Sequence, residues 1–382
     1  MTSKPDDREL LARLIAFDTT SHRSNLDLVA YLKERLERPG VRVEVHPSPE
    51  GTKANLLVRV GPRAGAGGEG LVLSGHMDVV PAGEGWTSDP FVLVERDGRL
   101  VARGACDMKG FLALAVGLVE RLDLGSLVHP LVLLFTYDEE IGTLGSKHFA
   151  RTWSSPEPLP RRVVVGEPTE LKVLRMHKGH LKLRLSFRGR SAHSGYPDLG
   201  RNAIEAAAKA VLALGELGGS LRAEHPLHGE EFPDVPYAPL NVARITGGVA
   251  INVVPERAAL EVGLRHLPGM RPDVLVERVR ASVSERIPAA DFDLELIGES
   301  PPMMAPPDGE LLRAALGLPG VTAGPGASFA TDAGWLGTLG MECVLFGPGS
   351  IQVAHRPDEY LPREELERAR GYLESLVGLF CA

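Results

Sequence analysis

The sequence is poor in cysteine, has no long apolar run and has no excess of positive charge. Three cysteines are an odd number in a chain of 382 residues, which argues against a disulfide framework and predicts a reducing, cytoplasmic location. A net charge of −8 argues against a nucleic-acid partner. The lack of an apolar run of about 18 residues predicts no membrane span. The first residues are charged, with no apolar stretch behind them, which predicts no secretory signal.

The cysteines also lack zinc-ribbon spacing, so any metal ion should have nitrogen and oxygen ligands. The length of 382 residues predicts two domains, and 43% hydrophobic and 24% charged residues are typical of globular proteins. From about residue 180, strict alternation replaces the continuous apolar runs, which marks a change from buried to half-exposed strands. The sequence therefore predicts an α/β domain of residues 1–179 and 298–382, interrupted by an α+β domain of residues 180–297.

The first domain should have a mostly parallel central sheet flanked by helices. We predict its strands at 41–45, 55–60, 71–73, 131–136, 163–165 and 344–346, and its helices at 7–16, 25–37, 111–122 and 364–379. The inserted domain should have four strands and two helices. We predict these strands at 181–187, 240–246, 258–265 and 291–297, and the helices at 202–217 and 272–286.

One stretch organises the first domain: residues 71–80, Leu-Val-Leu-Ser-Gly-His-Met-Asp-Val-Val. His76 and Asp78 follow a buried-strand run and, two residues apart in an extended backbone, they should point to the same side. The space beyond the carboxyl ends of strands in open α/β sheets is where ligands bind. Taken alone, the pair is weak evidence, and a histidine packed at a strand end explains it better.

Two more predicted strands end in carboxylates, with Glu139 and Glu140 after residue 136 and Glu167 after residue 165. Asp107 precedes a predicted helix, and His355 lies on a loop beyond a late strand. Each has a simpler explanation by itself: a solvated turn, a helix cap or a surface histidine. Together with His76, these residues suggest two imidazoles and three carboxylates around two divalent ions, with one carboxylate bridging.

Several motifs occur in one order along nearly the whole chain. They are Ser74-Gly-His-Met-Asp78, Gly104-Ala-Cys-Asp-Met-Lys-Gly110, Asp138-Glu-Glu140, Gly166-Glu-Pro168, Ser191-Ala-His-Ser194 and His355. In this order and spacing they resemble the dizinc amidohydrolase and peptidase superfamily, which includes aminoacylase, glutamate carboxypeptidase, succinyl-diaminopimelate desuccinylase and acetylornithine deacetylase.

The resemblance implies a metal-dependent amidohydrolase with two divalent ions per subunit. His76 and Glu167 would hold one ion, Glu140 and His355 the other, and Asp107 would bridge both. Zinc is the metal that the resemblance favours, although a nitrogen and oxygen ligand set also accepts cobalt or manganese.

The resemblance also implies catalytic roles around these ligands. Glu139 would be the general base, and the carboxylate of Asp78 would orient the ring of His76. The peptide bond between Asp107 and Met108 would be cis.

In the inserted domain the resemblance implies a lid that also forms a homodimer. His193 would reach the active site of the partner subunit and stabilise the tetrahedral intermediate. Asn252 and Arg265 would grip the carboxylate of an N-acyl amino acid substrate, although Arg265 is also explained as a charge on a strand surface.

Two stretches, 165–180 and 347–360, resemble the acetylornithine deacetylases more than they resemble other members of the superfamily. That resemblance implies removal of the acetyl group from N2-acetyl-L-ornithine, giving ornithine and acetate in arginine biosynthesis. We also expect Asp332 to meet a cationic amine of the substrate. The alternatives are a deacylase of succinyl-diaminopimelate, N-acetylcitrulline or an N-acyl lysine, and a non-catalytic metal-binding scaffold.

Overall fold

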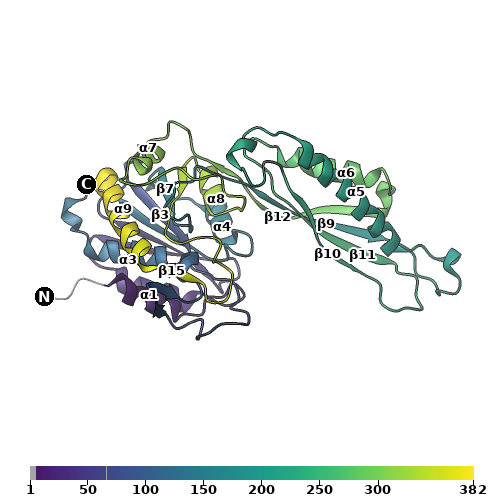
Figure 1. Ribbon diagram of the computed structural model, residues 1–382, viewed down its shortest axis with the longest axis horizontal. Coiled ribbons are helices and arrows are strands. Elements are labelled where there is room, and N and C mark those ends of the chain that lie inside the picture. The colour runs from purple at the N-terminus through teal and green to yellow at the C-terminus, as the bar shows by residue number, and fades with distance from the viewer. Residues whose placement is uncertain (1–5, 66) are drawn as a thin grey trace. The chain divides into compact units, whose positions relative to one another are not determined.

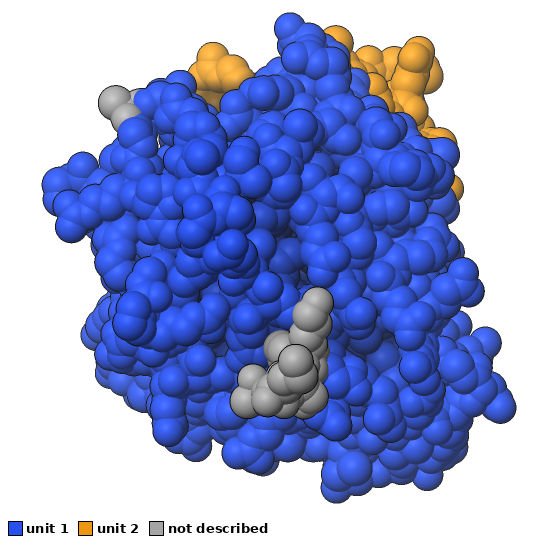
Figure 2. All heavy atoms as spheres, turned by 90° about the vertical axis from the view of Figure 1, so that its left-hand side faces the viewer, with its two compact units in different colours: residues 1–176, 303–324, 331–382 blue, residues 177–302, 325–330 orange. Residues whose placement is uncertain are grey.

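The computed structural model describes residues 6–65 and 67–382, and the chain forms two compact units. Unit 1 comprises Met1–Met176, Met303–Gly324 and Thr331–Ala382, and unit 2 comprises His177–Pro302 and Pro325–Ala330 (Figures 1 and 2). Residues 1–5, on which the prediction of no secretory signal partly rests, lie outside the described residues.

The boundaries of unit 2 lie close to residues 180 and 297, where the sequence placed them, but residues 325–330 were predicted to belong to the first domain. This short segment packs within unit 2. Its Gly326 donates its N–H to the carbonyl of Glu231 at 2.6 Å, and a Cβ at this glycine would lie 2.5 Å from the Phe232 ring. A glycine is therefore needed for the close approach of the two segments.

The central sheet of unit 1 has the strand order β1-β2-β6-β3-β7-β14. These strands are β1 (Val41–Pro47), β2 (Ala54–Val60), β3 (Leu71–His76), β6 (Leu131–Thr136), β7 (Arg162–Val165) and β14 (Glu342–Leu345). Neighbours from β6 to β14 are parallel, and β1 and β2 add two antiparallel steps. The predicted mostly parallel sheet is confirmed.

Helices cover the sheet because its central strands are buried along their whole length. Alternate residues of β3, Leu71 and Leu73, belong to one core cluster with residues of four helices. These are α1 (Asp7–Ile15), α2 (Leu26–Leu36), α3 (Gly110–Arg121) and α9 (Arg363–Cys381), all at predicted positions (Figure 1).

Three further helices of unit 1 were not predicted: α4 (Leu144–Thr152), α7 (Glu310–Leu316) and α8 (Ala333–Thr338). Helices α7 and α8 are too short to show the 3.6-residue period, whereas α4 is as long as α1 but buries only one large apolar side chain, that of Phe149. A small sheet combines β4 (Val94–Arg96), β5 (Arg99–Val101) and β15 (Tyr360–Pro362). The two-residue strands are β8 (Met176–His177) and β13 (Met303–Met304), and 3-10 turns lie at Leu124–Ser126, Pro197–Leu199, Gly229–Glu231 and Ala289–Asp291.

Unit 2 has the predicted four strands and two helices (Figure 1). Its antiparallel sheet has the order β10-β11-β9-β12, from β9 (His180–Arg188), β10 (Leu240–Gly247), β11 (Arg257–Leu264) and β12 (Phe292–Ser300). Every second residue of β9 from Leu181 to Phe187 is buried. The long helix α5 (Ala203–Ala223) packs on β9, β10 and β11, and α6 (Pro272–Ser284) packs on α5.

Among the described residues, no helix combines the length and apolar character needed to cross a membrane.

His266 is a buried histidine of unit 2 that the fold holds in its neutral form. Its side chain is 1% exposed, and neither ring nitrogen has a hydrogen-bond partner in residues 6–65 and 67–382. Gly179 makes room for the ring, since a Cβ there would lie 2.2 Å from Cε1 of His266. Burial lowers the pKa of His266 to about 4, because the imidazolium would lose its hydration.

We expect the stability of the protein to fall as the pH drops from about 6.5 to about 4. In this window the unfolded chain protonates His266 and the folded chain does not, so folding must expel a proton. The difference from the usual pKa of 6.5 to about 4 corresponds to at most roughly 3 kcal/mol. Urea unfolding of the His266→Leu variant at about pH 7.5 and about pH 5 should show a smaller loss of stability than in the wild type.

The matched control is His225→Leu, which removes an exposed histidine of the same unit. This variant should lose as much stability between the two pH values as the wild-type protein does. An equal pH dependence in the His266→Leu variant and the wild type would show that His266 is not held neutral.

Candidate metal centre

The ends of three adjacent parallel strands bring the predicted ligands to one edge of the sheet. His76 is the last residue of β3, Glu140 lies in the loop after β6, and Glu167 lies in the loop after β7. Because β6, β3 and β7 are neighbours in parallel, their carboxyl ends meet. Asp107 joins them from the turn Ala105–Lys109 that precedes α3, and His355 from the segment after β14.

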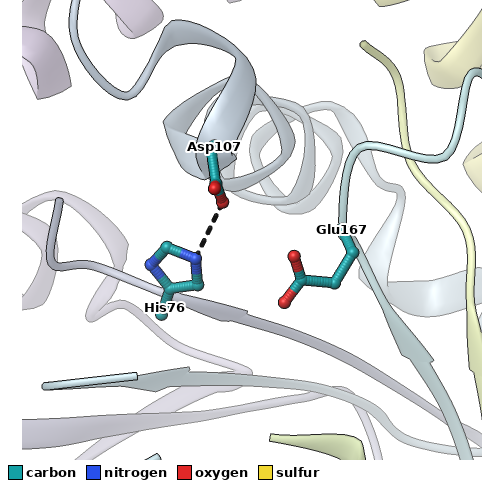
Figure 3. A group of neighbouring side chains, drawn as sticks. All are labelled: His76, Asp107 and Glu167. Atoms are coloured by element: carbon teal, nitrogen blue, oxygen red, sulfur yellow. Dashed lines mark hydrogen bonds and ion pairs between the residues drawn. The ribbon is translucent and has the colours of Figure 1, made fainter. Parts of the chain in front are cut away.

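The five side chains form two clusters that share one member. His76, Asp107 and Glu167 form the first (Figure 3), and Asp107, Glu140 and His355 form the second. Within each cluster, one ligand atom of every residue lies within 4.8 Å of the others.

Asp107 faces both clusters because its two oxygens have different neighbours. Its Oδ1 lies 3.0 Å from Nε2 of His76, and its Oδ2 lies 3.2 Å from Nε2 of His355. The Nε2 atom of His355 also lies 3.1 Å from Oε2 of Glu140. Asp107 therefore presents one oxygen to each cluster. The peptide bond between Asp107 and Met108 is cis, as the resemblance implied.

The orientation of His76 comes from the backbone of Asp78 and not from its carboxylate. Nδ1 of His76 lies 2.8 Å from the carbonyl oxygen of Asp78, whereas the carboxylate oxygen is 3.8 Å away. A carbonyl oxygen only accepts, so Nδ1 carries a proton, and Nε2 is the ring nitrogen that faces the first cluster. The predicted carboxylate contact of Asp78 is therefore replaced by a backbone contact.

The carboxylate of Asp78 instead holds the loop that carries the predicted base. It accepts the N–H of Glu139 at 3.0 Å and the N–H of Glu140 at 3.3 Å. The hydroxyl of Ser21 donates to it at 2.7 Å. One residue thus fixes both a metal-facing ring and the loop of the neighbouring strand. Nothing in the local pattern around Ser21 indicated this contact, because its partner lies 57 residues away.

The electrostatics of the centre favour a bound cation. Burial raises the pKa of Glu167, and the charge of Asp107 raises it further. The same two causes, in the same order, raise the pKa of Glu140. One oxygen of Glu167, Oε1, is buried without a hydrogen-bond partner among the described residues. Crowded buried carboxylates with an unsatisfied oxygen are costly without a counter-charge, so these residues fit metal ions.

The pKa of Glu139 is also affected by the charged side chains of the two clusters. Burial raises its pKa, the positive charge of His76 opposes that rise, and the charges of Glu167, Asp332 and Glu140 add to it. The predicted base is therefore close to the shared ligand clusters. Its backbone is held by Asp78, as described above.

Asp332 is buried beside this centre, with its side chain 1% exposed. It accepts a hydrogen bond from the hydroxyl of Thr136, the last residue of β6. Its predicted contact with a substrate amine does not fit this burial. Sequence reasoning also missed the ion pair of Lys53 with Asp138, the residue before Glu139. Such partners are distant in sequence, and no local motif marks them.

The other predicted functional residues lie in unit 2. The segments of His193 and Asn252 are adjacent, since the N–H of Ser194 donates to the carbonyl of Asn252 at 3.0 Å. The N–H of Gly195 donates to Nδ1 of His193 at 3.0 Å, which leaves Nε2 to carry the proton of the neutral ring. Arg265 directly follows β11, and its N–H donates to the carbonyl of Pro239.

Comparison with known proteins identifies the class to which this fold and site belong. Residues 72–378 match the peptidase family M20/M25/M40, and the chain belongs to this family. It is an enzyme of the metallopeptidase and amidohydrolase class. The acetylornithine deacetylase of Myxococcus xanthus is 36% identical over 379 residues, which cover 98% of this chain and 97% of that protein.

Solved structures show the same fold at lower identity. An M20 family metallo-carboxypeptidase from Sulfolobus solfataricus has a TM-score of 0.78 at 18% identity and covers 98% of this chain and 99% of its own. Aminopeptidase PepT from Bacillus cereus has a TM-score of 0.73 at 20% identity, with 97% and 98% covered. A dinuclear metal-binding M20 peptidase from Bacillus subtilis has a TM-score of 0.67 at 16% identity, with 98% of both chains covered.

The crowding of carboxylates predicts opposite effects of Glu167→Gln on stability and on metal binding. In the metal-free protein the change removes a buried charge next to Asp107. The free energy of unfolding should therefore increase by on the order of 1 kcal/mol, and the midpoint of thermal unfolding should rise with it. Cobalt affinity should fall at least about tenfold, because one carboxylate ligand is lost. Thermal unfolding of chelated protein and calorimetric titration with Co²⁺ measure the two effects.

The control is Glu34→Gln, an exposed carboxylate on α2, which should change neither quantity. A metal-free Glu167→Gln variant that is less stable than the wild type and binds Co²⁺ equally well would contradict the assignment.

Proposed function

We propose that the protein hydrolyses N2-acetyl-L-ornithine to ornithine and acetate, with two divalent metal ions per subunit. The observation that carries this proposal is the pair of ligand clusters that share Asp107, in a chain 36% identical to an acetylornithine deacetylase along nearly its whole length. Zinc is the metal we expect, and cobalt or manganese fits the same donors.

The reaction needs a polarised amide carbonyl and a nucleophilic water, and two bound divalent ions supply both by acting as Lewis acids. Glu139 takes a proton from the attacking water as its oxygen bonds to the acyl carbon. When the carbon–nitrogen bond breaks, Glu139 passes that proton to the leaving amine. His76, Asp107, Glu140, Glu167 and His355 hold the ions. Asp78 keeps Glu139 in place through the hydrogen bond to its N–H.

Unit 2 supplies the remaining groups in this proposal. His193 carries its proton on Nε2, because Nδ1 accepts from Gly195, and that N–H donates to the oxyanion of the tetrahedral intermediate in the partner subunit. Arg265 binds the substrate carboxylate with its planar fork, and Asn252 adds a second contact. Unit 1 is then the catalytic domain, and unit 2 is a lid through which two subunits form a homodimer.

Mixing two inactive variants tests the base and the shared active site together. Glu139→Gln removes the base but leaves the ligands, and His193→Ala removes the donor, so each variant alone should lose at least about 100-fold in kcat. In a mixed dimer, one active site combines an intact Glu139 with the intact His193 of the other subunit. Refolding or exchanging the two variants together should therefore restore up to about half of the activity per mixed dimer.

The control is each variant mixed with itself under the same treatment, which should stay inactive. A Glu139→Gln variant with wild-type kcat would refute the mechanism and support a different base. Failure of the mixture to recover activity, while both variants bind two Co²⁺ ions, would show that His193 acts within its own subunit.

The substrate proposal rests on the similarity to the acetylornithine deacetylase of Myxococcus xanthus, which covers nearly the whole chain. We expect kcat/KM for N2-acetyl-L-ornithine to exceed that for other acylated amino acids by at least about tenfold, or about 1.4 kcal/mol. The panel contains N-succinyl-L,L-diaminopimelate, N-acetylcitrulline and an N-acyl lysine, assayed with added Zn²⁺ or Co²⁺.

A higher kcat/KM for one of these competitors would transfer the assignment to that deacylase and leave the metal mechanism intact. Hydrolysis of none of them by protein that holds two metal ions would favour the non-catalytic scaffold. Full activity after exhaustive chelation would refute a metal mechanism altogether.

A further inference from the structure

Glu359 is a buried carboxylate outside the two ligand clusters that contacts the backbone of the shared ligand. Its side chain is 1% exposed, and its Oε1 accepts the N–H of Cys106 at 2.9 Å and the N–H of Asp107 at 3.0 Å. Two adjacent N–H groups in a buried turn need an acceptor. Here one charged oxygen satisfies both, and hydrogen bonds to a carboxylate are stronger than those to a neutral group.

The second oxygen of Glu359 binds a buried arginine. Nη1 of Arg103 donates to Oε2 at 2.6 Å, and both side chains are 1% exposed. Arg103 is itself fixed, because Nη2 donates to the carbonyl of Ala82 at 3.2 Å and the guanidinium lies 5.1 Å from the centre of the Trp86 ring. The carboxylate thus has a counter-charge and a defined rotamer, so its position relative to the turn of Asp107 is rigid.

The backbone around Glu359 is held in register with the segment before Asp107. The N–H of Ala102 donates to the carbonyl of Glu359 at 3.0 Å, and β15 pairs with β5 directly beyond it. The contact between Glu359 and Asp107 spans 252 residues of sequence. His355 precedes Glu359 by four residues on the same segment, so this contact ties the two segments that carry Asp107 and His355.

We propose that Glu359, braced by Arg103, is a positioning residue that fixes the separation of Asp107 and His355. It touches neither a metal nor a substrate. It holds the turn of Asp107 by its N–H groups and the segment of His355 by its own place in the chain, so it acts on the cluster of Asp107, Glu140 and His355. The inference rests on the proposed two-metal function, and it adds a specific support for the second ion.

The test replaces the buried ion pair by apolar side chains of similar length, in the double variant Arg103→Met/Glu359→Met. Such exchanges of a buried pair are often neutral for stability, whereas removal of one partner is not. Co²⁺ is titrated into chelated protein, and the number of ions bound and the affinity for each are measured by calorimetry and by visible absorption. Thermal unfolding of the same samples reports on the fold.

The wild-type protein should bind two Co²⁺ ions. The double variant should keep the first ion, lose about ten- to a hundredfold in affinity for the second, and unfold near the wild-type temperature. The single variant Glu359→Asp keeps the charge but shortens the side chain, so it should lose affinity for the second ion in the same way.

The matched control is Glu342→Gln. Glu342 also accepts a backbone N–H, that of Leu312 at 3.0 Å, but it is the first residue of β14 and so lies at the end of the parallel strands opposite to the ligands. The control should bind both ions as the wild type does.

The possible failures are distinguishable. Wild-type protein that binds fewer than two ions would overturn the proposed metal centre and, with it, a role for Glu359. Wild-type protein that binds two, with a double variant that binds both equally tightly, would overturn the positioning role alone. A variant that loses both ions only together with its thermal unfolding transition would show that Glu359 is structural and would likewise overturn it.

Discussion

The carboxylate of Asp107 is the constraint on which the rest of the site depends. It is 5% exposed and has an imidazole nitrogen about 3 Å from each of its oxygens. Burial raises its pKa, but the hydrogen bonds of His355 and His76 outweigh that effect and hold it below the usual range. A buried charge that faces two ways needs partners on both sides. The ends of strands β3 and β7 provide the partners on one side, and the loops that carry Glu140 and His355 provide those on the other.

Much of this arrangement could be predicted because a parallel sheet gathers its strand ends. His76, Glu140 and Glu167 were recognisable as polar residues directly after buried-strand runs, and neighbouring parallel strands bring such residues together without any further information. Helices α1, α2, α3 and α9 and the four strands of unit 2 were also predictable, since each shows a clear apolar pattern. Helices α7 and α8 are too short for such a pattern, and α4 buries a single large apolar side chain.

The supporting contacts could not be predicted, because they depend on pairings between distant segments. From the two-residue spacing of His76 and Asp78, the contact between these residues was predicted correctly, but the atom of Asp78 that makes it was not. The ring is held by the backbone of Asp78, while its carboxylate serves Glu139 and Glu140. Glu359 looks like an ordinary surface acid in the sequence, and Asp332 was expected to meet a substrate amine, yet each is 1% exposed. Burial of a single carboxylate is decided by its tertiary neighbours and not by its local sequence.

The pairing of Asp107 with His355 has a topological consequence. The two residues belong to parts of unit 1 that precede and follow unit 2 in the sequence. A cation held by both would close a loop that contains the whole of unit 2, as a cross-link does, and would restrict the unfolded chain accordingly. Unit 2 can then unfold and refold inside the closed loop, while unit 1 cannot come apart without releasing the ion. The metal would make a unit built from separate pieces of chain as cooperative in unfolding as one built from a continuous piece.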